Sequence, residues 1–253
     1  MELVRKDPYY IKNIDNPSEE IQLEAIKDNG NVLKFIKNPS ITVQWTALKN
    51  NVWVIEYIEN PSEEMSLFAV EGAWNTLKFI KNPSDKVLKK AASIKGWALQ
   101  YIKNPSEEIK EIAVKKDWDS VKYIKNPSEK IQLMAVSKYF GALKYIDNPT
   151  MEVKRKAIIE NAEAINYIED INEDNMKIFL EDNVDIIKYV GSRIDIEWAK
   201  EIFKDKLKSE NIDREYVLKF INCNVLTIDK LSFIHDYGSD RVKRIFVDYK
   251  LSY

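Results

Sequence analysis

Cysteine, histidine and glycine are scarce in this chain. Its 253 residues include one Cys, Cys223, one His, His235, and six Gly. A single Cys excludes an internal disulfide and is typical of a reducing compartment. A metal site needs a cluster of ligands at workable spacing, and a phosphate loop needs clustered glycines, and the sequence contains neither. We therefore predict no metal and no cofactor.

Catalytic side chains are equally sparse. Cys223 and His235 lie in the same terminal region, so a nucleophile pair is formally possible. A buried thiol and an ordinary surface or packing imidazole are the alternative that we favour. An all-helical stack can carry DNA-glycosylase chemistry, so the fold class alone does not exclude an enzyme. We predict that the chain is not an enzyme.

Long apolar runs and an excess of one charge are also missing. No stretch approaches the ~18 apolar residues of a membrane span, and the segment MELVRKDPYY has no apolar signal core. We predict a cytoplasmic protein without a membrane partner. Lys and Arg number 39 against 41 Asp and Glu. This balance argues against a protein that binds chiefly phosphate backbones, because such binding needs an excess of cations.

What the chain does contain is a repeat of 22 residues. Self-similarity with a period of about 20 to 50 residues indicates a solenoid or another repeat array. Asn-Pro pairs recur at this constant spacing and begin at Asn16, Asn38, Asn60, Asn82, Asn104, Asn126 and Asn148.

Counted from its Asn, each repeat predicts two helices. Asn at position 1 and Pro at position 2 predict a helix start, and an acidic residue at position 4 completes a capping-box-like pattern. An apolar residue at position 6 and Ala at position 10 make one helix face, and the invariant Ala indicates a close approach between helices. Gly, Asn or Asp at positions 13 to 16 predict a left-handed helix end.

A short second helix, α or 3₁₀, is predicted to follow and to carry an aromatic residue at position 20. We assign this ring to the core. The residues at position 20 are Phe35, Tyr57, Phe79, Tyr101, Tyr123, Tyr145, Tyr167 and Tyr189.

These features predict an all-α fold, a right-handed or gently curved α-solenoid of 22-residue two-helix repeats. A repeat this small cannot bury its own apolar face and must stack on its neighbours. Residues 1–191 are expected to hold a half repeat and eight full repeats, the last with Ile171 in place of Pro and Phe179 in place of Ala. Beyond Gly191 the rhythm fails, and residues 192–253 are predicted to form an irregular helical C-terminal cap, with helices in IDIEWAKEIFKDKLKSE, DREYVLKFI and DRVKRIFVDYKLSY.

The pattern NPSEE(I/V)Q…A(V/I)…LKYIK, over roughly residues 4–190, resembles the short two-helix repeats of unknown function found in many bacterial, phage and giant-virus proteins. It is more distantly similar to HEAT-like and variant leucine-rich repeats. The resemblance implies a binding scaffold and carries no catalytic residues. In mobile-element genomes it further implies a candidate inhibitor of a host defence effector, for instance of the CRISPR type.

Aromatic residues at positions 15 and 16 are candidate partner-binding residues. Together with a Trp at the variable position 8 they are expected on one side of the first helix. Large rings beside a variable position favour a recognition stripe, whereas the alternative is that they cap the small core of each repeat, which we favour. The candidates are Trp45, Trp53, Trp74, Trp97, Trp118 and Phe140.

Two sets of lysines raise nucleic-acid binding as an alternative. Lysines at positions 19 and 22 would form a ridge, although acidic helix starts adjoin it, so that local pairing and solvation explain them. A second cluster is better placed to form a basic patch. It contains Lys86, Lys89, Lys90, Lys95, Lys110, Lys115 and Lys116.

The leading hypothesis is a non-enzymatic scaffold that binds a macromolecule along one extended surface, and a protein is the partner that we favour. The motivation is a long repeat array with balanced charge and no catalytic set. The first alternative is binding of nucleic acid or of a nucleoprotein complex such as a defence effector. The second is a structural or assembly role through the irregular C-terminal segment.

Overall fold

The structure, a computed structural model, describes residues 1–169, 171–190 and 194–252, and these residues form helices and no strand. The chain forms two compact units, Met1–Ile124 and Lys125–Tyr253. The predicted change of architecture at Gly191 lies outside the described residues. The all-helical fold and the repeated pairing of a longer with a shorter helix, which the sequence predicted, are confirmed.

The N-terminal unit, Met1–Ile124, alternates α-helices with 3₁₀ helices. Its α-helices are α1 (Glu2–Lys6), α2 (Glu19–Ile26), α3 (Ile41–Asn50), α4 (Glu63–Gly72), α5 (Asp85–Ile94) and α6 (Glu107–Lys116). Its 3₁₀ helices are η1 (Pro8–Asn13), η2 (Gly30–Phe35), η3 (Val52–Tyr57), η4 (Trp74–Phe79), η5 (Gly96–Tyr101) and η6 (Trp118–Tyr123). From α2 to α6 the helix starts keep the 22-residue spacing of the sequence.

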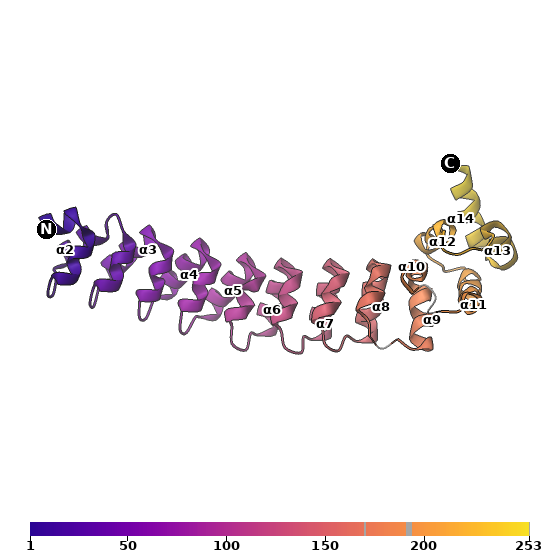
Figure 1. Ribbon diagram of the computed structural model, residues 1–253, viewed down its shortest axis with the longest axis horizontal. Helices are drawn as coiled ribbons and strands as arrows, with labels where there is room; N and C mark the ends of the chain where they lie inside the picture. Colours follow the sequence, from indigo (N-terminus) through magenta and orange to yellow (C-terminus); the bar gives the residue numbers. More distant parts are fainter. Residues whose placement is uncertain (170, 191–193, 253) are drawn as a thin grey trace. The chain divides into compact units, whose positions relative to one another are not determined.

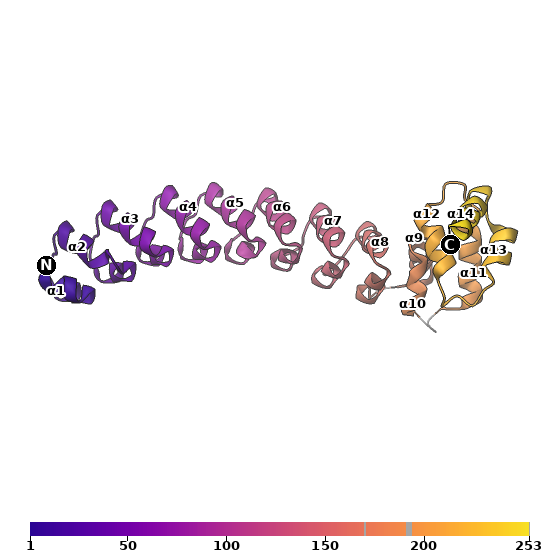
Figure 2. The same ribbon diagram turned by 90° about the horizontal axis from the view of Figure 1, so that it is seen from above.

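Within this unit the helices lie in two layers (Figures 1 and 2). Consecutive α-helices from α2 to α6 contact one another and make an α layer, and consecutive 3₁₀ helices contact one another and make a 3₁₀ layer. The core lies between the layers and is supplied by apolar residues at positions 6, 10 and 11 of the α-helix and at positions 17, 18 and 21 of the second segment, such as Val43, Ala47, Leu48, Val54, Ile55 and Ile58. Each repeat therefore buries its apolar face against its neighbours.

The C-terminal unit, Lys125–Tyr253, begins with the same alternation and ends with longer helices. The repeated part contains α7 (Glu129–Lys138), η7 (Phe140–Tyr145), α8 (Met151–Glu160), η8 (Ala162–Tyr167), α9 (Glu173–Asp182), η9 (Val184–Ile186) and α10 (Ile187–Val190). The remainder contains α11 (Ile196–Leu207), α12 (Arg214–Asn222), α13 (Lys230–Tyr237) and α14 (Asp240–Leu251). The three helices predicted beyond residue 193 are present, and α13 is an addition that the sequence patterns did not predict.

Helices α11 and α12 cover the last repeat of the C-terminal unit. Helix α11 packs on α9, and α12 packs on η9 and α14. Phe203 and Phe220 are fully buried, with ring centroids 5.8 Å apart. The Tyr216 hydroxyl donates a hydrogen bond of 2.8 Å to the carbonyl oxygen of Leu180 and so satisfies one of the last acceptors of α9. Phe179, which replaces the usual Ala, is buried in this larger core.

The helix starts differ from the sequence prediction. The N-cap is the Ser or Thr at position 3, not the Asn at position 1. From α3 to α8 its side chain accepts the backbone N–H three residues on, as Ser40 does from Val43, whereas Ser18 of α2 makes no such bond. Asn16, Asn38, Asn104 and Asn126 instead have φ between 50° and 55°. This is the left-handed region, which Asn tolerates better than most residues and which avoids the αR conformation that a following Pro disfavours. The Asn-Pro pair is therefore the turn before the cap.

The cap residues also join consecutive repeats. The hydroxyl groups of Ser40, Ser84 and Thr150 donate hydrogen bonds to the carboxylates of Glu19, Glu63 and Glu129, each at the first helical position of the preceding repeat. The Thr150 bond is 2.6 Å long. One side chain thus caps its own helix and holds the acidic residue that complements the neighbouring helix dipole.

The helix ends also differ from the prediction, because they are not left-handed. The residue between the two helices is extended, with φ of −153° at Asn51 and −134° at Asp117. It serves both as C-cap of the α-helix and as N-cap of the 3₁₀ helix. An extended residue here allows the second helix to begin at once and turn back along the first.

Close approach, not left-handed backbone, accounts for Gly30 and Gly96. A Cβ atom at Gly30 would lie 2.5 Å from the carbonyl oxygen of Ala47 in the next repeat, and one at Gly96 would collide with the carbonyl oxygen of Ala113. The alanines at position 10 are fully buried, for example Ala47 and Ala113. The predicted close approach at position 10 is confirmed, and it is tightest against these two glycines.

Gly30→Ala and Gly96→Ala are each expected to lower the free energy of unfolding by about 1–3 kcal/mol, because the new methyl group meets a backbone oxygen that cannot rotate away. Urea denaturation followed by circular dichroism measures this. Lys116→Ala, an exposed substitution near Ala113, is the control and should change stability by less than about 0.5 kcal/mol. Equal effects of the three substitutions would contradict the proposed close approach.

Ser84→Ala is expected to cost about 1 kcal/mol of stability through loss of the cap, and also to raise the pKa of Glu63. The hydrogen bond from Ser84 is the main cause that holds the Glu63 pKa below its usual value; burial opposes the shift and Lys86 adds to it. A lowered folded-state pKa stabilises above the unfolded value, so the wild-type advantage should shrink as pH falls through the Glu63 pKa.

Ser62→Ala is the matched control, because Ser62 caps α4 and donates to Glu64 of its own helix. It should cost similar stability and leave the Glu63 pKa unchanged. Carboxyl carbon shifts of Glu63 in an NMR titration distinguish the two variants. An unchanged Glu63 pKa in Ser84→Ala would refute the link between repeats.

Candidate binding surface

Most of the aromatic candidates lie in the second helix of a repeat. Because α3 ends at Asn50, Trp53 belongs to η3 and not to the first helix. Trp45 lies in α3 and contacts Phe68 of α4, with ring centroids 5.8 Å apart. The expected one-sided arrangement of position 8 with positions 15 and 16 is therefore not formed. The remaining candidates begin or follow the start of a 3₁₀ helix: Trp53 in η3, Trp74 in η4, Trp97 in η5, Trp118 in η6 and Phe140 in η7.

Rings at positions 15 and 16 bridge consecutive repeats. Trp53 meets Phe79 with centroids 6.3 Å apart, and Trp74 meets Tyr101 at 6.0 Å. In the C-terminal unit Phe140 meets Tyr167 at 6.1 Å. The second ring of each pair stands at position 20 of the following repeat. The 3₁₀ layer thus carries aromatic pairs across the junctions between repeats.

The aromatic residue at position 20 is not a core residue, which corrects the sequence prediction. Phe35, Tyr57 and Tyr101 are 37%, 42% and 38% exposed. Position 20 is the last residue of the 3₁₀ helix, and the buried residues are at positions 17 and 18 within the helix and at position 21, the extended residue that follows it, for example Val54, Ile55 and Ile58. The ring then packs against the aromatic side chain of the preceding repeat.

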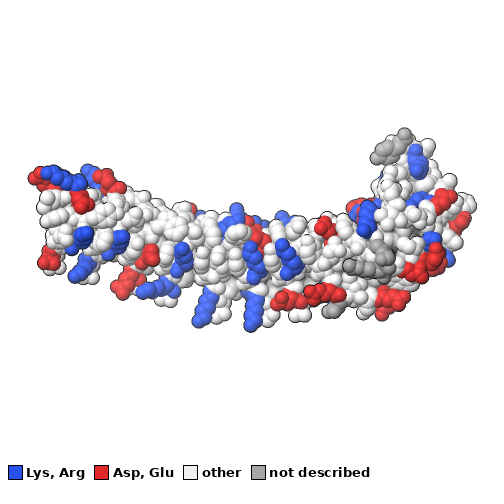
Figure 3. Space-filling model, viewed as in Figure 1, with Lys and Arg blue, Asp and Glu red and all other residues white. Residues whose placement is uncertain are grey.

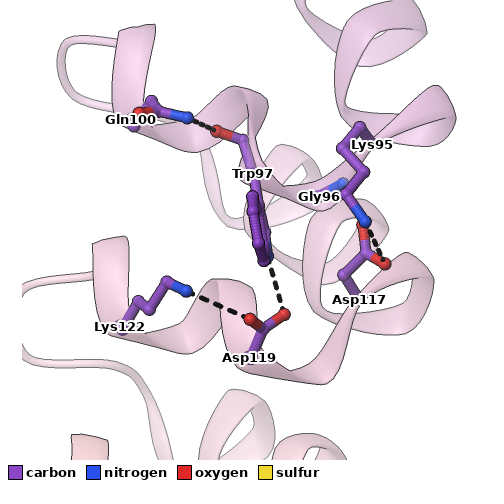
Figure 4. Close-up of polar contacts among 7 residues, drawn as sticks. All are labelled: Lys95, Gly96, Trp97, Gln100, Asp117, Asp119 and Lys122. Carbon is purple, nitrogen blue, oxygen red and sulfur yellow. Dashed lines mark hydrogen bonds and ion pairs between the residues drawn. The ribbon is translucent and has the colours of Figure 1, made fainter.

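Trp97 is held by polar contacts on several sides (Figure 4). Its indole N–H donates a hydrogen bond of 2.7 Å to Asp119 Oδ1, one repeat further on. Asp119 Oδ2 accepts one of 3.1 Å from Lys122, whose ammonium lies 4.3 Å from the centre of the indole ring. Lys95 lies 4.8 Å from the same ring and pairs with Asp117 at 3.1 Å. The indole is therefore fixed before any partner binds.

The Asp119 carboxylate stays charged in this cluster. Partial burial favours the neutral form, but the bonds from Trp97 and Lys122 outweigh it and lower the Asp119 pKa. Asp119 stands at the repeat position that Trp97 occupies one repeat earlier. The spacing of 22 residues between Trp97 and Asp119 could have predicted this contact from the sequence, but we did not identify it there.

Lysines at position 19 lie beside these rings. The ammonium of Lys34 is 4.8 Å from the Phe35 ring centre, and that of Lys78 is 4.7 Å from Phe79 and 5.6 Å from Trp53. Cation–π contacts of this kind are favourable and orient the lysine side chain. We call the exposed part of this layer the aromatic–lysine face. Its exposed rings are Phe35, Trp53, Tyr57 and Tyr101, and its exposed lysines are Lys34, Lys37, Lys78, Lys81 and Lys103.

Most lysines of the predicted basic patch are paired with carboxylates. Lys89 contacts Asp85 at 2.8 Å and Glu108 at 2.7 Å, and Lys90 contacts Glu71 at 2.8 Å. Lys86, Lys95 and Lys110 pair with Glu63, Asp117 and Glu107. Lys115 and Lys116 occupy the last turn of α6, where a positive charge complements the helix dipole. Local pairing therefore accounts for most of this charge.

The reactive side chains of the C-terminal unit do not form a nucleophile pair. Cys223 is fully buried. The His235 side chain is 82% exposed, and its Nδ1 lies 3.0 Å from Asp236 Oδ1. Within the described residues no group of His, Cys, Asp and Glu is arranged to hold a metal ion. Over the same residues no helix has the length and apolar character needed to cross a bilayer.

A hollow of about 420 Å³ in the C-terminal unit is lined by residues of α9 and α11 and the segments before them, including Met176 and Trp198. Two of its polar side chains, Asn172 and Asp195, cap the N-termini of α9 and α11. Asn172 accepts the backbone N–H of Asn175, and Asp195 accepts that of Glu197, each at 2.8 Å. Both are therefore N-caps, and their presence in the hollow has a structural cause.

Comparison with family models, with curated proteins and with solved structures finds no match to this chain. The specific repeat family that the sequence resembles thus stays a prediction, as do the partner-binding roles of the aromatic residues.

Lys230 is the one lysine, among the described residues, whose ammonium is buried without a hydrogen-bond partner. It lies 4.5 Å from the centre of the Phe220 ring. Burial lowers the pKa of Lys230 from 10.5 to about 8, and the nearby Cys223 opposes the shift. A proton is thus bound more tightly in the unfolded chain than in the folded one.

The free energy of unfolding is therefore expected to gain a contribution from Lys230 as pH rises from about 8 to 10.5. Lys230→Met removes the buried charge and should stabilise the protein by about 1 kcal/mol at pH 7, after discounting for solvent screening. Urea denaturation of both proteins across this range tests the linkage. The variant's advantage should vanish at high pH; a constant advantage would contradict the lowered pKa.

Proposed function

We propose that this chain is a non-enzymatic scaffold that binds another protein along one extended surface of a right-handed or gently curved α-solenoid. The observation that carries the proposal is the ordered row of aromatic pairs across the repeat junctions of the 3₁₀ layer. A stack of similar repeats presents equivalent positions at regular intervals, so a small preference at one repeat is multiplied along the array. Rigid aromatic side chains are the usual anchors of protein interfaces.

The charge distribution favours a protein over nucleic acid as the partner. The N-terminal unit holds 18 basic and 18 acidic residues. Most lysines of the predicted basic patch are already paired, for example Lys89 with Asp85 and Glu108. Tight binding of a phosphate backbone depends on many unneutralised cations. The role of a mobile-element inhibitor of a defence effector rests on the repeat resemblance alone, and we carry it as a special case of protein binding.

The test is capture of partners from the native host by the full chain, with and without nuclease, followed by calorimetry with the purified partner. We expect a protein that is retained after nuclease treatment and that binds the purified chain saturably. Recovery of nucleic acid alone would overturn the proposal. So would catalytic turnover that disappears in Cys223→Ala or His235→Ala.

A further inference from the structure

The 3₁₀ layer of the N-terminal unit, which carries the aromatic–lysine face, holds more of the unit's exposed large apolar side chains than the α layer does. Nine large apolar side chains of this unit are exposed, and five of them, Tyr9, Phe35, Trp53, Tyr57 and Tyr101, belong to 3₁₀ helices. Exposed apolar side chains that recur at equivalent positions form a continuous stripe, unlike scattered single residues, and such a stripe is typical of interaction sites.

Unpaired positive charge follows the same stripe. Within the described residues Lys34, Lys37, Lys78, Lys81 and Lys103 form no ion pair. In the described part of the α layer Lys86, Lys89 and Lys90 are paired, and the lysines without an ion pair lie in the last turns of their helices, at Lys49, Lys115 and Lys116. In Figure 3 basic side chains follow one another along the N-terminal unit, with acidic side chains between some of them. The five lysines of the aromatic–lysine face are thus available to a partner, whereas Lys122 of η6 pairs with Asp119.

Counting by position shows that the charges are segregated. Positions 19 and 22 in residues 1–124 hold seven lysines and three acidic residues. The rest of the N-terminal unit holds 11 basic and 15 acidic residues. The unit is neutral as a whole, yet this edge is positive and the remainder is negative. A bound segment with negative charge would therefore be attracted to this face and repelled by the remainder.

The rings are fixed in advance. Trp53 and Phe79 pack against each other, and Lys78 lies beside both. Trp97 is held by Asp119 and flanked by Lys95 and Lys122. A partner that docks here has little side-chain entropy to remove, which favours binding.

From these observations we propose, on the basis of the protein-binding function above, that the aromatic–lysine face binds an extended acidic segment of its protein partner. Neighbouring helices pack about 8–10 Å apart, and an extended chain rises about 3.3 Å per residue. Each repeat therefore matches about three residues of the ligand. Carboxylates spaced by about three residues meet the lysines at positions 19 and 22 in the repeats that begin at Asn16, Asn60 and Asn82, and the residues between them lie against the rings. The repeat that begins at Asn38 has Glu56 and Glu59 at these positions and offers the carboxylates no partner.

Single-stranded nucleic acid fits this face less well. Base stacking needs free ring faces, and the lysines that lie close to the rings of Phe35, Phe79 and Trp97 compete for those faces. A peptide carboxylate instead meets an ammonium that its ring contact has already positioned. The neutral total charge of the unit points the same way.

The experiment measures fluorescence anisotropy of a labelled peptide of about 18 residues with Glu at every third position, titrated with the full chain at low salt. Its Gln counterpart and a labelled oligothymidylate of similar length are run beside it. We expect saturable binding of the Glu peptide that weakens with salt, and weaker binding of both other probes. Absence of Glu-peptide binding, equal binding of the Gln peptide, or tighter binding of the oligonucleotide would overturn the inference.

The variant Lys34→Gln, Lys78→Gln, Lys81→Gln should weaken the Glu peptide about tenfold, since three exposed ion pairs are lost. The matched control Lys49→Gln, Lys115→Gln, Lys116→Gln removes three exposed lysines of the α layer and should leave binding unchanged. Circular dichroism checks that both fold. Equal losses would mean that charge alone attracts the peptide and would overturn the assignment of the face.

The same two variants separate this inference from the proposed function. If a captured protein partner binds the aromatic–lysine variant and wild type equally well, the face assignment fails and the scaffold function stands. If no protein partner binds either, the function itself fails.

Discussion

Everything in the repeated part of this protein depends on the close contact between the backbone of one repeat and the small residues of the next. A repeat of 22 residues is too short to enclose a core, so its apolar positions are buried only when a neighbour covers them. Ala at position 10 allows the helices to meet, and at Gly30 and Gly96 the approach leaves no room for a Cβ atom. The favourable free energy of burying apolar surface therefore arises at the junctions between repeats. The stability of one repeat consequently depends on the presence of its neighbours.

The hydrogen bonds from the cap residues Ser40, Ser84 and Thr150 to the preceding repeat, which we call the cap ladder, restrict how consecutive helices can lie against each other. A Ser such as Ser84 accepts a backbone N–H of its own helix and donates to the first acidic residue of the preceding one. Both interactions are satisfied only when consecutive helices start at the same level. Apolar contacts alone tolerate sliding, whereas a hydrogen bond with two fixed partners does not. At the three junctions formed by Ser40, Ser84 and Thr150, the hydroxyl at position 3 and the Glu at position 4 of the preceding repeat therefore help to set the register between repeats.

The sequence predicted this architecture because its information is periodic. Spacing, buried Ala and the position of the second helix all follow from the 22-residue pattern, and nearly the whole repeated part of the fold could be predicted. The errors arose where two residue types compete for one role. Asn16 and Ser18 are both good caps, and only the conformation forced by Pro17 decides between them. The prediction that the residue at position 20 lies in the core was wrong, because an aromatic side chain can equally well lie half-exposed against a ring of the preceding repeat. The contact between Trp97 and Asp119 escaped prediction because it joins different repeats.

The acidic residues of the cap ladder also help to explain why the aromatic–lysine face lies on the 3₁₀ layer. Acidic residues are needed at the α-helix starts, where they complement the helix dipole and accept the cap hydroxyl. Lysines near these helix starts then pair with carboxylates, as Lys86 does with Glu63. The 3₁₀ helices of the N-terminal unit contain few acidic residues, so lysines such as Lys34 and Lys78 lie beside rings without an ion pair, whereas Lys122 of η6 pairs with Asp119. Segregation of charge between the layers is thus a consequence of how the repeats are joined. A binding face on the 3₁₀ side requires no feature beyond those that build the fold.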